Sequence, residues 1–181
     1  MRQTLRLHPD SSCLAVTHIE VEVARPRERS LVFAYAVTGR ISDLAIPAVV
    51  TAARNGELWR HTCFEAFVAS PPDVAYYEFN FAPSTQWAAY RFTCHRDGMH
   101  VATEVDGPAI EVHSAPGRYT LQASLDLQGL SGLPRDVGWR LGLAAIAEDT
   151  RGGKSYWALA HPPGKPDFHH FDCFAHELSA A

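Results

Sequence analysis

The 181-residue sequence has no long apolar run, no paired-cysteine motif and no block of basic residues. No window approaches the roughly 18 apolar residues that a membrane-spanning helix needs, and the first residues lack the apolar core of a signal peptide. We therefore expect a cytoplasmic protein with no membrane contact. The 16 lysines and arginines against 20 aspartates and glutamates give a net charge of -4. No basic stretch is long enough to follow a phosphate backbone, which argues against nucleic acid as a partner.

The four cysteines are also far apart, at Cys13, Cys63, Cys94 and Cys173. Their spacing fits neither a zinc ribbon nor a thioredoxin-like motif, so we expect reduced thiols, although two of them could pair in an exported protein. The sequence contains no G-x-S-x-G, P-loop or G-x-G-x-x-G signature. These absences predict a protein without catalytic residues, bound metal or cofactor.

No segment keeps a helical period, whereas many short stretches alternate apolar and polar residues between Gly- and Pro-rich turns. The expected strands cover residues 4–8, 13–24, 30–38, three stretches within 58–93, 99–105, 109–113, 118–127, 139–147 and 155–160. We expect 13–24 and 30–38 to form a hairpin and 4–8 to be an edge strand. Residues 139–147 are apolar on both faces, and Gly142 leaves room for another layer or a ligand. The pattern predicts one all-β domain over 1–181, an antiparallel β-sandwich of the immunoglobulin-like or jelly-roll-like kind.

The stretch 58–93 reads as three neighbouring strands whose two faces differ in chemistry. In the first strand, Trp59, His61 and Glu65 share the face opposite Phe64, because side chains alternate with period two. The same alternation places Glu78 and Asn80 together on the second strand and Arg91 on the third. Aromatic, carboxylate, amide and guanidinium groups on one sheet face predict a surface that recognises a polar ligand.

A second group of candidates lies in the Pro-rich segment 161–174, whose prolines favour an extended path. His161 and His169 in this segment could meet His61 if the segment crosses the polar sheet face. Imidazole and carboxylate groups can bind zinc, iron or copper, and a histidine or Met99 could be an axial haem ligand. The run HHFD matches neither the H-x3-H nor the H-E-x-x-H spacing of metal sites, so we expect these histidines to hydrogen-bond loop carbonyls and hold the segment in place.

The run LWRHTCFEAFV resembles a strand of type-nine carbohydrate-binding modules and related DOMON-like domains. In that family a Trp is followed six residues later by a Glu within an E-x-F pattern, here Trp59, Glu65 and Phe67. The similarity continues through YYEFNFAPSTQWAAYRF and WRLGLAAIAED to Trp157, and covers about residues 29–174. The sequence also looks like intracellular proteobacterial proteins of unassigned function.

The resemblance implies that Trp59 and Trp157 sandwich a sugar ring and that Glu65 binds its hydroxyls. Members of the superfamily bind sugars, haem or nothing yet identified, so the ligand does not follow from the fold. Sugar rings do stack on aromatic side chains, while carboxylate, amide and guanidinium groups bind hydroxyls. We predict a non-catalytic domain that binds a small polar ligand, most simply a saccharide, on a concave sheet face. The predicted ligand-binding residues are Trp59, His61, Glu65, Glu78, Asn80, Arg91, Trp157, His161 and His169.

Three alternatives stay open at this point. A structural or protein-interaction domain would use the same aromatic residues for packing, and Glu65 with Arg91 as a cross-strand ion pair. Haem or metal binding would draw on the histidines. A glycoside-processing enzyme would use Glu65 and Glu78 as its carboxylate pair. The oligomeric state is not indicated by the sequence.

Overall fold

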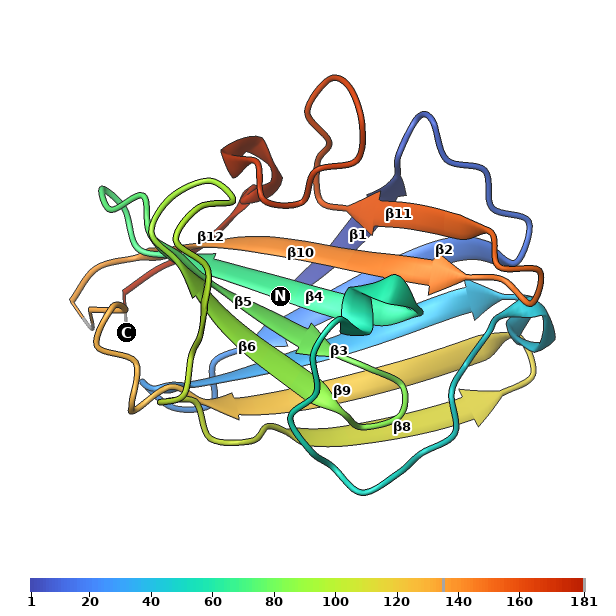
Figure 1. Ribbon diagram of the computed structural model, residues 1–181, viewed down its shortest axis with the longest axis horizontal. Coiled ribbons are helices and arrows are strands. Elements are labelled where there is room, and N and C mark those ends of the chain that lie inside the picture. The colour runs from blue at the N-terminus through green and yellow to red at the C-terminus, as the bar shows by residue number, and fades with distance from the viewer. Residues whose placement is uncertain (135, 181) are drawn as a thin grey trace.

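The computed structural model describes residues 1–134 and 136–180, which form one curled antiparallel sheet of twelve strands (Figure 1). Its strands are β1 Arg2–Leu7, β2 Val16–Ala24, β3 Ser30–Gly39, β4 Cys63–Ala69, β5 Tyr76–Phe81, β6 Trp87–Phe92, β7 His100–Val101, β8 Ala109–Ala115, β9 Arg118–Asp126, β10 Trp139–Glu148, β11 Lys154–Ala158 and β12 His176–Leu178. Their order is β7-β6-β5-β4-β10-β11-β1-β2-β3-β9-β8, and β12 pairs with β10. The all-β prediction is confirmed. The single domain expected over residues 1–181 includes residues 135 and 181, which lie outside the described residues.

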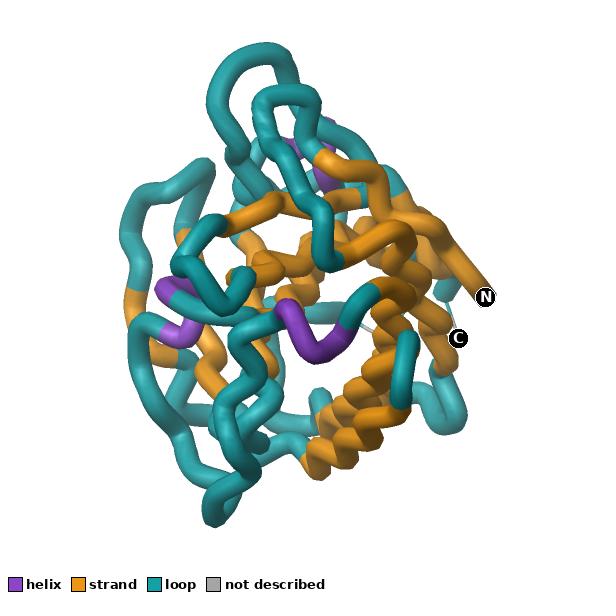
Figure 2. The backbone as a smooth tube through the Cα atoms, turned by 90° about the vertical axis from the view of Figure 1, so that its right-hand side faces the viewer, coloured by secondary structure: helices purple, strands orange, loops and turns teal. Residues whose placement is uncertain are grey.

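The curl of the sheet brings its two halves face to face as the layers of a sandwich. One layer runs from β7 to β11, and the other contains β2, β3, β9 and β8. Figure 2 shows the strands curving around the interior. β1 joins the layers, because it pairs with β2 along one edge and with β11 along the other. The expectation that 4–8 is an edge strand is therefore wrong, while the hairpin of β2 and β3 is confirmed.

The core between the layers is built by alternate side chains of both. Phe64 on β4 packs against Tyr35 on β3 with ring centroids 5.0 Å apart, and Phe81 on β5 lies 6.1 Å from Phe33. The hydroxyl of Tyr35 donates a 2.8 Å hydrogen bond to the carbonyl oxygen of Glu65. This inner face of β4 and β5 is the apolar face expected from the period of two.

Residues 161–174, which we call the strap, cover the outer face of the β4-β10 region. The strap contains one short 3₁₀ helix, η3 Phe171–Cys173, although an extended path was expected throughout. A Cβ atom on Gly142 of β10 would lie 3.2 Å from Cβ of Phe67 and 3.4 Å from the carbonyl oxygen of Cys173. The small residue at 142 thus lets the strap approach, as the sequence predicts. β10 is almost wholly buried because the strap and the core cover its two faces.

Two further 3₁₀ helices, η1 Ile41–Asp43 and η2 Leu58–Arg60, lie in the long connection between β3 and β4. The strand expected from residue 58 begins only at Cys63. Glu57 has a φ of 56°, in the left-handed region, and the amide of His61 bonds the carbonyl of Leu58 to close the turn. Trp59 and His61 are therefore not strand residues. Among the described residues, no helix has the length and apolar character needed to cross a membrane.

Candidate functional site

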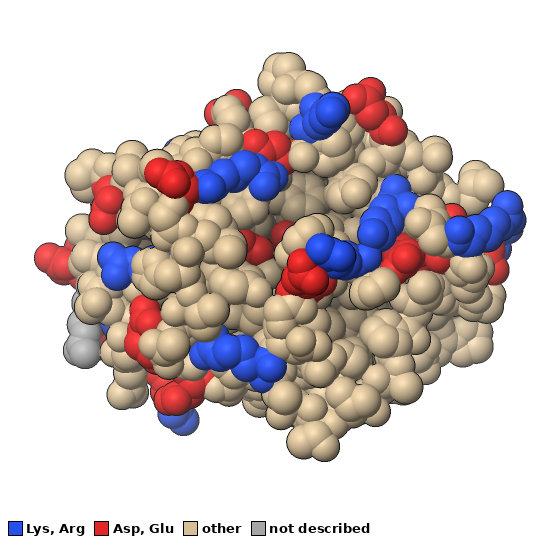
Figure 3. Space-filling view, viewed as in Figure 1, with Lys and Arg blue, Asp and Glu red and all other residues tan. Residues whose placement is uncertain are grey.

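The outer face of the β6-β5-β4-β10-β11 layer carries a cleft of about 590 Å³, which we call the outer cleft. Figure 3 shows acidic atoms recessed near the middle of this face. The volume lies in the range of about 300–1,000 Å³ that is usual for small-molecule sites. The cleft is lined by Gly56, Glu57, Trp59, Glu65, Glu78, Tyr90, Phe92, Arg96, Met99, Ile146, Tyr156, Pro166, Phe168 and His169.

The floor of the outer cleft is polar and comes from two paired strands. Glu65 of β4 stands opposite Asn80 of β5 in the strand register, and Glu78 lies two residues before Asn80 on the same face. Nδ2 of Asn80 donates a 2.7 Å hydrogen bond to Oε1 of Glu78. All three side chains are buried, with at most 5% of the residue surface exposed. Polar groups so deeply buried cost free energy unless they find partners, so the floor is built to hold hydrogen bonds.

The two carboxyl groups of the floor hold their protons unusually tightly. Burial raises the pKa of Glu78 to about 7, although the hydrogen bond from Asn80 and the charge of Arg96 act in the opposite direction. Burial, together with the nearby charge of Glu78, holds the pKa of Glu65 well above its ordinary value. Two like charges in a desolvated site cannot both ionise easily. At neutral pH the floor therefore keeps at least one proton.

His169 of the strap closes one side of the outer cleft. Its Nδ1 atom lies 2.9 Å from the hydroxyl of Tyr76, and its Nε2 atom lies 3.9 Å from Oε2 of Glu78. Burial and the charge of Arg96 lower the pKa of His169 to about 4, so the imidazole is neutral at pH 7. Asp167 anchors the strap next to it, through contacts of 2.8 Å to Nη2 of Arg96 and 2.9 Å to Nε2 of His95.

Aromatic side chains form the walls of the cleft. Trp59 projects from η2 with 46% of its surface exposed, and the guanidinium of Arg60 lies 5.4 Å from its ring centroid. Tyr156 of β11 and Phe168 of the strap form another wall, with ring centroids 6.1 Å apart. Partly exposed rings above a hydrogen-bonding floor can bind a ligand that has apolar faces and polar edges.

Solved structures with the same fold are known. A crystal structure of a "putative carbohydrate-binding protein" from Bacteroides uniformis superposes with a TM-score of 0.68 and 15% identity, over 93% of this chain and 81% of that one. A family 9 carbohydrate-binding module from Caldicellulosiruptor kristjanssonii, in complex with cellotriose, gives a TM-score of 0.53 and 11% identity over 91% and 74%. The fold is of the carbohydrate-binding-module type. No protein-family model matches the chain, and no curated protein does.

The carbohydrate-binding-module fold brings five of the nine predicted site residues together. Glu65, Glu78, His169 and Trp59 line the outer cleft, and Asn80 lies directly below it. Trp59 reaches the cleft from η2 and not from a strand. The predicted outward face of β4 and β5 thus coincides with the floor of a cleft.

The other four predicted residues lie elsewhere. Trp157 is buried in the core between the layers, where its indole Nε1 donates a 3.0 Å hydrogen bond to Ser155, so it does not oppose Trp59. Arg91 lies over the ring of Tyr77, which belongs to the inner face, with 5.6 Å to the centroid. The predicted sandwich of a ring between two tryptophans is therefore not formed.

The remaining two are histidines outside the outer cleft. His61 is exposed and pairs with Glu148 at 2.8 Å, beside a neighbouring hollow under the loop 45–57. Nε2 of His161 lies 2.8 Å from the carbonyl oxygen of Arg6. Arg6 belongs to strand β1, so this histidine contacts a strand carbonyl where a loop carbonyl was expected. Neither shares a site with His169.

Sequence reasoning missed the aromatic residues that line the walls. The sequence predicts Arg91 on the polar face, but its neighbour Tyr90 pairs with Glu78 in the register and shares that outer face, while Arg91 lies over Tyr77 of the inner face. Tyr156 faces the cleft because its neighbour Trp157 faces the core. The alternation along each strand was visible in the sequence, but it does not say which face meets the core.

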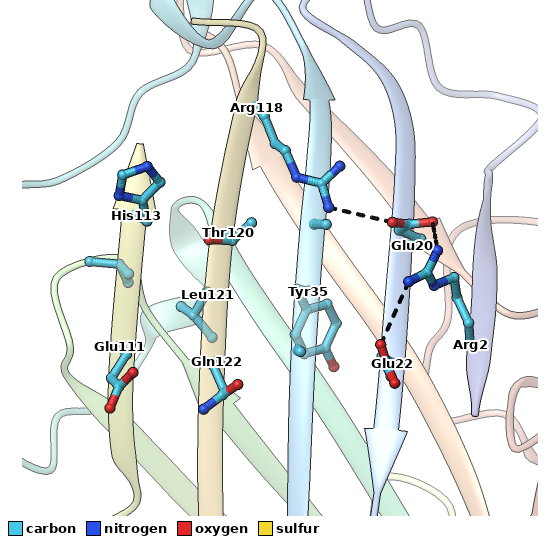
Figure 4. A pocket seen from close by; sticks show the side chains of 13 residues that line it. Arg2, Glu20, Glu22, Tyr35, Glu111, His113, Arg118, Thr120, Leu121 and Gln122 are labelled. Atoms are coloured by element: carbon cyan, nitrogen blue, oxygen red, sulfur yellow. Dashed lines mark ion pairs between the residues drawn. The ribbon is translucent and has the colours of Figure 1, made fainter. Parts of the chain in front are cut away.

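The outer face of the other layer carries a smaller hollow of about 300 Å³ (Figure 4). Arg2 of β1 lies 3.9 Å from Glu20 and 3.7 Å from Glu22, and Arg118 of β9 lies 3.5 Å from Glu20. These charges balance each other across neighbouring strands, as on many solvated sheet faces. Among the described residues that line this hollow, no buried side-chain atom lacks a hydrogen-bond partner, in contrast to the outer cleft.

The haem alternative rests on Met99 and His169, which both line the outer cleft. Both ring nitrogens of His169 already face protein groups, Tyr76 and Glu78, and the cleft floor is made of buried carboxyls. This arrangement does not fit a haem with His169 as its axial ligand. Within residues 1–134 and 136–180, no group of three or more His, Cys, Asp or Glu side chains could hold a metal ion.

Proposed function

We propose that this protein is a non-catalytic saccharide-binding domain whose site is the outer cleft. The observation that carries the proposal is the half-exposed ring of Trp59 beside the buried floor of Glu65, Glu78 and Asn80. The floor supplies hydrogen-bonding groups for hydroxyls, and the ring offers an apolar surface for the C–H face of a pyranose. The likeness to a family 9 module in complex with cellotriose supports a saccharide as the ligand. We also propose that the protein is related to DOMON-like domains, because its run LWRHTCFEAFV resembles a strand of that family.

Glycoside hydrolysis is the second candidate, because Glu65 and Glu78 lie on neighbouring strands of one cleft. Hydrolysis needs one protonated and one ionised carboxyl group. Burial raises the pKa of both groups, to about 7 for Glu78 and well above the ordinary value for Glu65, so the pair has a candidate for the protonated partner but no carboxyl group whose pKa is ordinary or low to act as the ionised one. An assay for released reducing sugar separates the two functions.

The proposed function is tested by a glycan array followed by calorimetric titration of the saccharides that bind. We expect Trp59→Ala to weaken binding by about tenfold or more, as loss of a stacking anchor does at many binding sites. Leu14→Ala is the matched control, since Leu14 is 79% exposed and does not line the cleft. If no saccharide binds the wild-type chain, or if Trp59→Ala leaves affinity unchanged, the proposal is wrong. A protein-interaction domain without a small ligand would then be the better interpretation.

A further inference from the structure

The floor of the outer cleft has more hydrogen-bond acceptors than donors. Oε1 of Glu65 and Oδ1 of Asn80 have no hydrogen-bond partner in the part of the chain that the structure describes. Glu65 is only 3% exposed and Asn80 is fully buried. Buried acceptors without donors destabilise a fold, so their presence at a cleft points to a donor that arrives from outside.

The floor also lacks a positive partner. Among the described residues, neither Glu65 nor Glu78 forms an ion pair with a lysine or an arginine. Arg96 lines the cleft but is held by Asp167, which accepts hydrogen bonds from its Nε at 2.9 Å and contacts its Nη2 at 2.8 Å. His169 stays neutral at pH 7, because burial and the charge of Arg96 lower its pKa to about 4. The charge of Arg96 favours ionisation of both carboxyl groups, but Arg96 forms its ion pair with Asp167, so a cation from outside would meet carboxyl groups that no lysine or arginine of the described residues pairs with.

Four further titratable groups around the floor, one thiol and three phenols, are uncharged near pH 7. Burial raises the pKa of the Cys63 thiol on β4 well above its usual value, and burial raises that of Tyr76 on β5 to about 12. Burial likewise raises the pKa of Tyr90 on β6, and that of Tyr35, which reaches Glu65 from the core side. These neighbours are neutral near pH 7, so they leave the acidic character of the floor unchanged.

We propose that the floor of Glu65, Glu78 and Asn80 binds an alkylammonium group, and that the saccharide held in the outer cleft is an amino sugar. This inference rests on the saccharide-binding function proposed above and names its ligand class. An ammonium group carries three N–H donors and a positive charge. It can therefore donate hydrogen bonds to the buried oxygens that have no donor and pair with the carboxyl groups that have no cationic partner among the described residues. When it binds, the carboxyl groups of Glu65 and Glu78 ionise and the proton that they hold near neutral pH is released to solvent, while the amine keeps its own proton and no covalent bond between heavy atoms changes. The sugar ring then lies against Trp59.

The test is calorimetric titration of the full chain at about pH 6.5, where a simple sugar amine is mostly protonated. The probes are the deacetylated disaccharide of chitosan, its fully N-acetylated counterpart, cellobiose and putrescine. We expect the deacetylated disaccharide to bind at least about tenfold more tightly than the two neutral disaccharides. Its enthalpy should also vary with the ionisation enthalpy of the buffer, because a proton is released on binding.

Two nearly isosteric variants, Glu65→Gln and Glu78→Gln, remove the acidic charge with little change in volume. Each should abolish both the preference for the amine and the release of a proton. Glu22→Gln is the matched control, because Glu22 lies on the opposite layer with 56% of its side chain exposed and should leave both unchanged. Thermal melting of each variant establishes that it is folded before it is titrated.

The remaining outcomes separate the inference from the proposed function. If the neutral disaccharides bind as tightly as the deacetylated one, the ammonium inference is overturned and saccharide binding stands. If putrescine equals the deacetylated disaccharide, the ligand class is a simple amine and the amino-sugar assignment is overturned. If no saccharide binds at all, the proposed function itself fails.

Discussion

The side-chain amide of Asn80 donates a 2.7 Å hydrogen bond to the carboxyl group of Glu78, with both residues buried on one strand. This bond fixes Glu78 in the floor of the outer cleft while Oδ1 of Asn80 has no hydrogen-bond partner among the described residues. The pair therefore combines a rigid position with remaining capacity to bind. Burial keeps the pKa of Glu78 at about 7 in spite of this bond.

The first prediction concerns how Glu78 affects stability at different pH values. The pKa of Glu78 rises from 4.5 in the unfolded chain to about 7 in the fold. Between these values the unfolded chain releases the proton and the folded chain keeps it, so stability falls as pH increases. At about 1.4 kcal/mol per pKa unit, the loss relative to Glu78→Gln is on the order of 3 kcal/mol by pH 7.5.

This prediction is measured by chemical denaturation of the wild type and of Glu78→Gln at about pH 4.5, 6 and 7.5. The variant is needed as a reference because His169 also changes stability with pH. Its pKa is lowered to about 4 in the fold, so it makes the free energy of unfolding rise with pH between about 4 and 6.5 in both proteins. A difference between the two proteins that does not change with pH would contradict the raised pKa.

The second prediction compares the two tryptophans that were expected to face each other. Trp157→Ala should lower the free energy of unfolding by about 3–5 kcal/mol, because Trp157 is buried in the core. Trp59→Ala should cost less than about 1 kcal/mol, because 46% of Trp59 is exposed. Urea denaturation of both variants checks this. Similar losses for both would show that Trp59 is mainly a packing residue.

The third prediction concerns the anchor of the strap. Although partial burial acts against it, hydrogen bonds from Arg96 and His95 hold the pKa of Asp167 below its ordinary value. Asp167→Asn should weaken both contacts, increase amide hydrogen exchange across residues 162–174 and reduce ligand affinity, because Phe168 and His169 line the cleft. Hydrogen exchange detected by mass spectrometry measures the first effect. Asp172→Asn is the control, since Asp172 is outside the cleft lining and should leave affinity unchanged.

The fourth prediction concerns the space between β10 and the strap. Gly142→Ala places a methyl group 3.2 Å from Cβ of Phe67 and 3.4 Å from a backbone carbonyl, and neither atom can move freely. We expect a destabilisation of about 1–3 kcal/mol, typical of overpacking. Gly56→Ala is the matched control, because its new methyl group would meet only the Tyr90 hydroxyl, at 3.8 Å. Equal melting temperatures for both variants would contradict the close approach.

Alternation along the chain was enough to predict most of the sheet. β2, β3, β9 and β10 lie close to their expected ranges, because the period of two is a local property of each strand. The two-residue β7 and the unexpected β12 are defined by their pairing with β6 and β10, which no local pattern contains. β1 is likewise interior and not an edge because the sheet curls.

The candidate site likewise has some features that follow from the sequence and others that depend on the tertiary structure. The sequence by itself determined that Glu78 and Asn80 share one face of β5, because they are two residues apart on one strand. The register of β4 with β5 then places Glu65 opposite Asn80, on the face that the sequence predicts. Only the tertiary structure decided that Tyr90 and Tyr156 join that face while Arg91 and Trp157 leave it. Strand register and the closure of one layer over another set these choices, and both depend on contacts between residues far apart in the chain.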